Sequence, residues 1–118
     1  MTLFAVMLGG AAGSALRYGV SVWLNPSVGA GIPWGTLTVN VIGCLLIGWM
    51  ANWMTGSNEA LRLGVLVGLL GGFTTFSSFG LETIRLVQSE QIGAAVIYVL
   101  VSNFAGLAAG WLGLQFNQ

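Results

Sequence analysis

The sequence predicts an all-α integral membrane protein with four transmembrane helices. Of its 118 residues, 56% are hydrophobic and only 5% are charged, whereas a typical soluble domain has roughly 25% charged residues. The charges are three arginines and three glutamates, and the uncharged tracts between them are long enough for spanning helices of about 20 residues. Six charges are too few to cover a soluble globule, which argues against a soluble enzyme, a nucleic-acid-binding protein and a disordered chain.

Turn-forming and polar residues divide the chain into these four helices. Breaks are expected at Asn25–Ser27, at Thr55–Glu59 and at Gln88–Gln91. A cleaved signal peptide is not expected, because no basic residue precedes the first apolar tract. Residues 1–118 therefore form a single membrane domain, with helices expected at about 2–24, 34–54, 61–87 and 92–114.

The sequence carries almost no signal for orientation in the membrane. Arg62 and Arg85 would lie on opposite sides, and the first loop and both tails contain no Lys or Arg. Either partner domains impose an orientation, or copies that face opposite ways pair about a two-fold axis in the membrane plane. We favour the second explanation, because inverted repeats are a common transporter device. Four short helices enclose little interior, so an aqueous pathway is expected to need a second subunit.

Small residues recur at four-residue spacing in several of the expected helices. Such spacing lets helix backbones approach closely within a membrane. The sequence therefore predicts close helix packing along these ridges, which are Gly9 and Gly13, Gly64, Gly68 and Gly72, and Gly106 and Gly110.

The third helix contains the densest group of polar residues, within the segment Gly71–Gly80. Paired glycines expose the backbone, and Thr and Ser hydroxyls compete for its hydrogen bonds. We therefore expect a break at about 71–75, with carbonyl groups freed to bind a cation or a second subunit. Irregular backbone at membrane depth is tolerated only where it is buried in protein or lines water. The alternative is an intact helix whose hydroxyls bond back to the preceding turn.

Two aromatic residues follow this expected break. Phe76 and Phe79 are three residues apart and share a helix face. An aromatic ring has a positive edge, so two ring edges beside a path would attract an anion, although packing is the simpler role for such a pair. The neighbouring Ser77 and Ser78 add hydroxyl donors.

Thr36 and Asn40 lie one turn apart on the second helix. The Asn40 amide is either a donor in a pathway or an interhelical hydrogen bond that holds the bundle together. Arg17 and Glu82 lie inside the helix ends and could extend to the interface. For Arg17 the other possibility is a cationic vestibule that concentrates anions.

The fourth helix carries Tyr98 and Ser102 on one face, with Asn103 beside them. The polar groups within the membrane are thus mainly hydroxyl, amide and guanidinium donors, which suit a small, strongly hydrogen-bonding anion better than an organic cation. An enzyme is not indicated, because the chain has no His or Asp. Its single cysteine, Cys44, is interpreted as a small apolar residue.

Three motifs resemble the Fluc (CrcB) family of fluoride channels. They are Gly9–Tyr18 (GGAAGSALRY), Pro33–Asn40 (PWGTLTVN) with Gly43 and Gly48 after it, and Gly71–Phe79 (GGFTTFSSF). The motifs touch three of the four helices in the expected order, and the length and helix count match from end to end. The resemblance implies an antiparallel, dual-topology homodimer that exports fluoride passively through two pores in the bacterial cytoplasmic (inner) membrane.

The resemblance also implies roles for individual residues. A structural sodium ion at the dimer centre would be held by the backbone carbonyls of Gly71 and Thr74. Arg17 would be a vestibule residue and Glu82 a pathway carboxylate. The remaining pathway residues would be Phe76, Phe79, Asn40, Ser77, Ser78, Thr36, Tyr98 and Ser102.

Two other functions remain open at this point. A small four-helix multidrug exporter, which carries cations, needs a buried carboxylate, and here only Glu82 could serve. A scaffold subunit without a pore would need a different partner protein.

Overall fold

The computed structural model describes residues 1–24 and 31–116. Within these residues, four helical segments are long and apolar enough to cross a membrane. They are α1 (Thr2–Leu24), α2 (Trp34–Trp53), a composite third span over Glu59–Gln88, and α6 (Ile92–Gln115). The prediction of an all-helical membrane protein with four spans is confirmed. The break predicted at Asn25–Ser27 lies outside the described residues.

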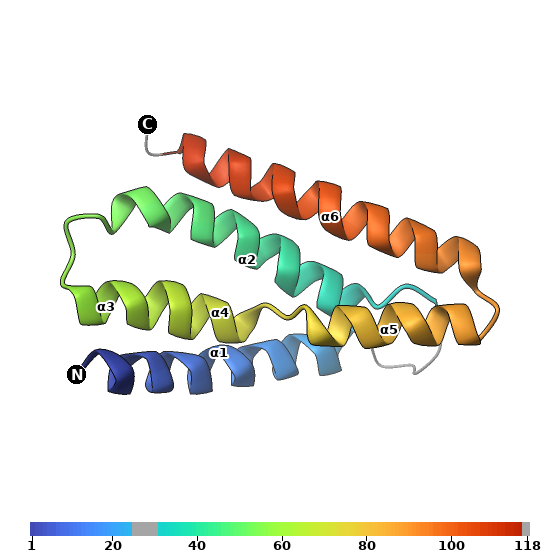
Figure 1. Cartoon of the computed structure of the whole chain (residues 1–118), viewed down its shortest axis with the longest axis horizontal. Helices are drawn as coiled ribbons and strands as arrows, with labels where there is room; N and C mark the ends of the chain where they lie inside the picture. The colour runs from blue at the N-terminus through green and yellow to red at the C-terminus, as the bar shows by residue number, and fades with distance from the viewer. Residues whose placement is uncertain (25–30, 117–118) are drawn as a thin grey trace.

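The third span is interrupted twice along its length. It consists of α3 (Glu59–Leu63), the π-helix η1 (Gly64–Leu69), α4 (Leu70–Phe73) and α5 (Ser77–Gln88). The predicted break is confirmed: the chain leaves the helix after Phe73, and Thr74 is extended with φ −88° and ψ 161°. Figure 1 shows the extended link between α4 and α5 near the middle of the molecule. The π-helix that precedes the break was not predicted.

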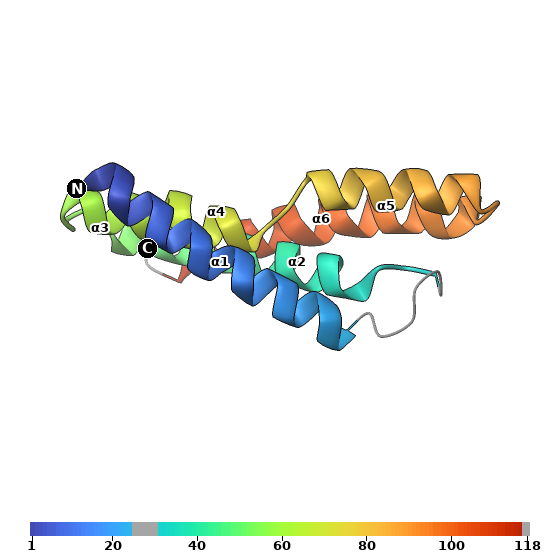
Figure 2. The same cartoon turned by 90° about the horizontal axis from the view of Figure 1, so that it is seen from below.

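The helices form two closely packed groups that the third span connects. On one side α1 packs against η1 and α4, and on the other α2 packs along α6. Beyond the break, α5 runs beside α6, as Figures 1 and 2 show. The break thus lies where the third span passes from α1 to α6.

Glycines allow α1 and the third span to touch backbone to backbone. A Cβ atom added at Gly68 would lie 2.6 Å from the Val6 carbonyl oxygen, and one at Gly72 would lie 2.7 Å from the Gly10 carbonyl oxygen. Side chains at these positions would push the helices apart. The predicted ridges on α1 and the third span therefore lie at a real helix contact, as membrane packing by small residues requires.

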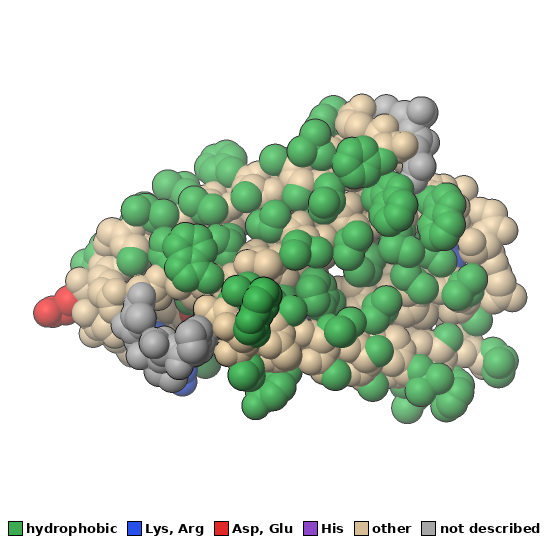
Figure 3. All heavy atoms as spheres, turned by 180° about the vertical axis from the view of Figure 1, so that it is seen from behind, with side chains coloured by type: hydrophobic (Ala, Val, Ile, Leu, Met, Phe, Trp, Pro, Cys, Tyr) green, Lys and Arg blue, Asp and Glu red, His purple; other side chains and the backbone are tan. Residues whose placement is uncertain are grey.

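Large hydrophobic side chains are exposed on all four spans. Figure 3 shows hydrophobic side chains over the face that it draws, with charged side chains visible toward the ends. The small buried cluster beneath consists of Leu37, Leu86, Ala95 and Tyr98. Large exposed hydrophobic side chains suit contact with lipid or with another membrane subunit. Neither of these surroundings contains the water that would make exposed apolar surface unfavourable.

Candidate functional site

The break in the third span is held open by Asn40 of α2. Its Nδ2 donates a hydrogen bond to the Thr75 carbonyl at 2.8 Å, and the Thr75 N–H donates to its Oδ1 at 2.7 Å. One amide therefore takes the place of both helical partners of Thr75. An amide nitrogen has two hydrogens, so Asn40 keeps one N–H for a further acceptor. The interhelical bond and a donor role are thus compatible.

Arg17 of α1 supplies a second replacement donor at the break. Its Nε donates to the Gly72 carbonyl at 3.1 Å. In a continuous helix this carbonyl would accept from the N–H of Phe76. A guanidinium at the end of α4 also lies where the helix dipole favours positive charge. The half-buried Arg17 is therefore bonded to the break, a contact that was not predicted.

Other carbonyl groups at the break have lost their helical donors. The Thr75 N–H, which would bond to the Gly71 carbonyl in a helix, goes to Asn40. The Ser78 N–H, the helical donor for the Thr74 carbonyl, goes to the Thr75 hydroxyl at 3.2 Å. Among the described residues, no hydrogen bond reaches the carbonyls of Gly71 or Thr74. The Thr74 hydroxyl donates to the Leu70 carbonyl at 3.1 Å, which is the bond expected if the helix were intact. The helix nevertheless ends at this point.

The Glu82 carboxylate accepts hydrogen bonds from two neighbouring helices. Thr36 Oγ1 of α2 donates to its Oε2 at 3.1 Å, and Tyr98 of α6 donates from its hydroxyl to Oε1 at 3.2 Å. Thr36 and Tyr98 are both buried. These three predicted residues therefore form one network that ties α5 to α2 and α6.

An aromatic series joins this network to the break. The ring centroids of Phe76 and Phe79 are 5.6 Å apart at an interplanar angle of 51°, and those of Phe79 and Tyr98 are 5.1 Å apart at 54°. Aromatic pairs prefer such tilted arrangements to a direct face-to-face stack. Phe76 lies at the outer end of the series and is 82% exposed.

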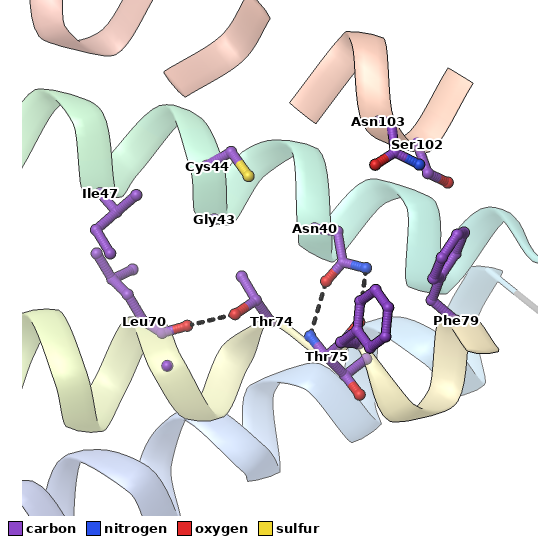
Figure 4. A pocket seen from close by; sticks show the side chains of 12 residues that line it. Asn40, Gly43, Cys44, Ile47, Leu70, Thr74, Thr75, Phe79, Ser102 and Asn103 are labelled. Atoms are coloured by element: carbon purple, nitrogen blue, oxygen red, sulfur yellow. Dashed lines mark hydrogen bonds between the residues drawn. The ribbon is translucent and has the colours of Figure 1, made fainter. Parts of the chain in front are cut away.

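A pocket of about 450 Å³ opens between α2, the break and α6 (Figure 4). Its polar lining includes Asn40 from α2, Ser102 and Asn103 from α6, and Thr74 and Thr75 from the break. The Ser102 hydroxyl oxygen is buried and has no hydrogen-bond partner in the described structure. The other lining residues are Gly43, Cys44, Ile47, Leu70, Gly71, Phe76 and Phe79.

Most of the predicted site residues are thus brought together, but in two groups. Asn40, Phe76, Phe79 and Ser102 line the pocket with Gly71 and Thr74, whereas Thr36, Glu82 and Tyr98 form the network at the end of the aromatic series. Ser77 is exposed, with its hydroxyl 3.4 Å from that of Thr75.

Two polar residues of the site were not assigned a role from the sequence, although Asn103 was placed beside Tyr98 and Ser102. Thr75 bonds to Asn40 and Ser78 at the break, and Asn103 lines the pocket. Thr75 lies inside the Gly71–Phe79 motif, and its position in that motif could have predicted it as a site residue.

No group of three or more acidic, Cys or His side chains that could hold a metal ion occurs within the described part of the chain. The carbonyls of Gly71 and Thr74 are suitable hard ligands for a cation.

The fold and the pocket define a small multi-pass membrane protein with a donor-lined pocket at a broken helix. Residues 4–114 match the family described as CrcB-like protein, Camphor Resistance (CrcB). The chain belongs to this family.

Several similar proteins carry the name fluoride-specific ion channel FluC. One from Thermus thermophilus is 50% identical over 115 residues, which cover 95% of this chain and 90% of the relative. One from Parabacteroides distasonis is 45% identical over 118 residues, covering 98% and 92%. One from Geobacter metallireducens is 42% identical over 118 residues, covering 98% and 95%. The similarity therefore extends across nearly the whole of each chain.

Proposed function

We propose that this protein is a fluoride channel that lets the ion leave the cell passively down its electrochemical gradient. One observation carries the proposal: neutral hydrogen-bond donors and two phenylalanine rings line one pocket in a membrane protein whose family relatives are named fluoride-specific ion channels. A channel carries out no covalent chemistry, so no catalytic residues are assigned.

The pocket offers donors without a full positive charge. The second N–H of Asn40 and the hydroxyl of Ser102 are available to replace part of the hydration shell of an anion. The edges of Phe76 and Phe79 add weak electrostatic attraction. Conduction requires binding that is favourable enough to admit the ion and weak enough to release it. Neutral donors meet this requirement better than a buried cation would.

The conducting form that we propose is an antiparallel homodimer with two pores. Phe76 is 82% exposed, and the pocket that it lines is open in the single chain, so a second copy would complete the wall. The near absence of an orientation signal in the loops supports insertion in both directions. Equal labelling of one introduced surface cysteine from both sides of the membrane, in a Cys44→Ser background, would support dual topology. Labelling from one side alone would contradict it.

We further propose a structural sodium ion at the dimer centre, held by the carbonyls of Gly71 and Thr74. These oxygens lack hydrogen-bond donors among the described residues, and such hard ligands suit Na⁺. The bound cation would neutralise the oxygens of the break. The residues of the pocket would still supply the contacts to the anion.

The bacterial relatives support a place in the cytoplasmic (inner) membrane. The multidrug-exporter alternative is not favoured. It would use Glu82 to exchange a proton against a cation, but both oxygens of that carboxylate already accept hydrogen bonds.

Anion efflux from reconstituted liposomes tests the proposed function. Vesicles loaded with fluoride should release it down a gradient, as measured with a fluoride-selective electrode, and chloride-loaded vesicles should retain their anion. Chloride release at a comparable rate, or no fluoride release by a stable reconstituted protein, would refute the proposal. Proton-driven uptake of a quaternary ammonium dye would instead support the exporter.

A further inference from the structure

Asn103 places an amide in the middle of a membrane-spanning helix. It lies near the centre of α6 (Ile92–Gln115), and its side chain is exposed in the single chain. A polar side chain at membrane depth faces a cavity or a protein partner far more often than lipid. Asn103 lines the same pocket as Asn40 and Phe79, and Figure 4 shows it beside Ser102 at the edge of that pocket.

The Asn103 amide uses only part of its hydrogen-bonding capacity. Its Nδ2 donates to the Val99 carbonyl of its own helix at 2.8 Å. This bond anchors the amide and leaves the second N–H free. The neighbouring Ser102 has a buried hydroxyl without a partner in the described structure. Consecutive residues of α6 thus carry two donors at one wall of the pocket.

We propose that Asn103 is a specificity-determining residue of the ion pathway, whose free N–H binds the permeating anion beside the Ser102 hydroxyl. The inference rests on the proposed fluoride channel. Asn40 of α2, which lines the same pocket, has the same arrangement, with one N–H bonded to a backbone carbonyl and the other free. An anion in this pocket would meet an amide donor from each of the two helices. Fluoride would bind to these donors more strongly than larger anions, because small anions form the strongest hydrogen bonds.

Fluoride flux into liposomes as a function of concentration tests this role. Asn103→Leu keeps the size of the side chain and removes the donor, so half-saturation should move to about tenfold higher fluoride, the cost of one hydrogen bond to a charged group. Asn103→Asp places a negative charge at the wall and should lower flux further, whereas Asn103→Gln keeps an amide and should restore part of it. Phe104→Leu changes the adjacent residue, which is 69% exposed and outside the pocket lining, and should match the wild type.

The outcomes separate this inference from the proposed function. If the wild-type protein does not conduct fluoride, the proposed function fails first. If it conducts and Asn103→Leu and Asn103→Asp keep the wild-type concentration dependence, Asn103 is not in the pathway. A loss of flux with unchanged half-saturation would also overturn the inference, because it indicates fewer active channels. Loss of the dimer in all three Asn103 variants, measured by size-exclusion chromatography, would assign Asn103 to subunit contact instead.

Discussion

The Nε of Arg17 lies 3.1 Å from the Gly72 carbonyl oxygen, and this bond joins α1 to the end of α4. The contact is possible only because α1 and the third span approach so closely. A Cβ atom at Gly72 would lie 2.7 Å from the carbonyl oxygen of Gly10, which precedes Arg17 on α1 by about two helical turns. Close glycine packing therefore positions the guanidinium that stabilises the break.

Replacing Arg17 should destabilise the break rather than merely change the charge of a vestibule. Arg17→Met leaves the Gly72 carbonyl without its donor, which should cost about 1–3 kcal/mol of folding free energy. Arg17→Lys keeps the charge, and its stability should lie between those of the wild type and Arg17→Met. Thermal unfolding in detergent measures the effect, with Arg62→Met in α3 as the control. Equal stability of the Arg17→Met and wild-type proteins would remove the bond from this role.

Asn40→Asp should strongly reduce fluoride flux while the fold is kept. The carboxylate can still accept from the Thr75 N–H, but it cannot donate to the Thr75 carbonyl and it repels an anion. We expect a loss of at least about tenfold, as for a lost hydrogen bond to a charged group. Efflux from proteoliposomes measures it. Wild-type flux in Asn40→Asp would exclude Asn40 from the pathway.

Phe76→Ile should also reduce fluoride flux without unfolding the protein. The Phe76 side chain is 82% exposed in the single chain, so its loss removes little internal packing, but it removes a ring edge at the pocket. Phe4→Ile changes a ring on α1 that is 58% exposed and outside the pocket lining, and it should leave flux unchanged. The same electrode assay compares the two variants. If Phe76→Ile conducts as fast as Phe4→Ile, the Phe76 ring has no role in the pathway.

Thr36→Val and Tyr98→Phe each remove one donor from Glu82. Each should cost about 1–3 kcal/mol of stability, because one carboxylate oxygen loses its partner inside the protein. Tyr98→Phe keeps the ring beside Phe79, which separates the hydroxyl from the aromatic contact. A double-mutant cycle tests the network. The two changes should be non-additive by more than about 0.5 kcal/mol, and strict additivity would mean that the two donors act independently.

Gly13→Ala and Gly19→Ala form a matched pair on α1. A Cβ atom at Gly13 would meet the Leu69 carbonyl and lie 2.8 Å from the Phe73 backbone nitrogen, whereas nothing lies within 4 Å at Gly19. Gly13→Ala should therefore destabilise by about 1–3 kcal/mol through overpacking. Gly19→Ala should be neutral or stabilising by up to about 1 kcal/mol through helix propensity. Equal unfolding temperatures would show that α1 does not pack as described.

The sequence predicts those features that depend on local chemistry. The break follows from Gly71, Gly72 and the hydroxyls after them, because such residues compete with helical hydrogen bonds. The bond between Arg17 and Gly72 could not be predicted, since it depends on how α1 crosses the third span. Asn103 was noticed beside Tyr98 and Ser102, but its place in the pocket depends on the rotation of α6 against α2.

The π-helix Gly64–Leu69 was missed because its glycine, valine and leucine residues are equally typical of an α-helix. A π-helical turn contains one residue more than the α-helical turn that it replaces. Each residue of an α-helix advances the chain by about 100° around its axis. Deleting one residue from this segment would keep the contact of Gly64 with Ala5 in place, but would turn α4 by roughly a quarter of a revolution and move Gly72 away from Gly10. The extra residue therefore sets the angular phase at which Gly72 meets α1, and with it the position of the carbonyl that accepts from Arg17.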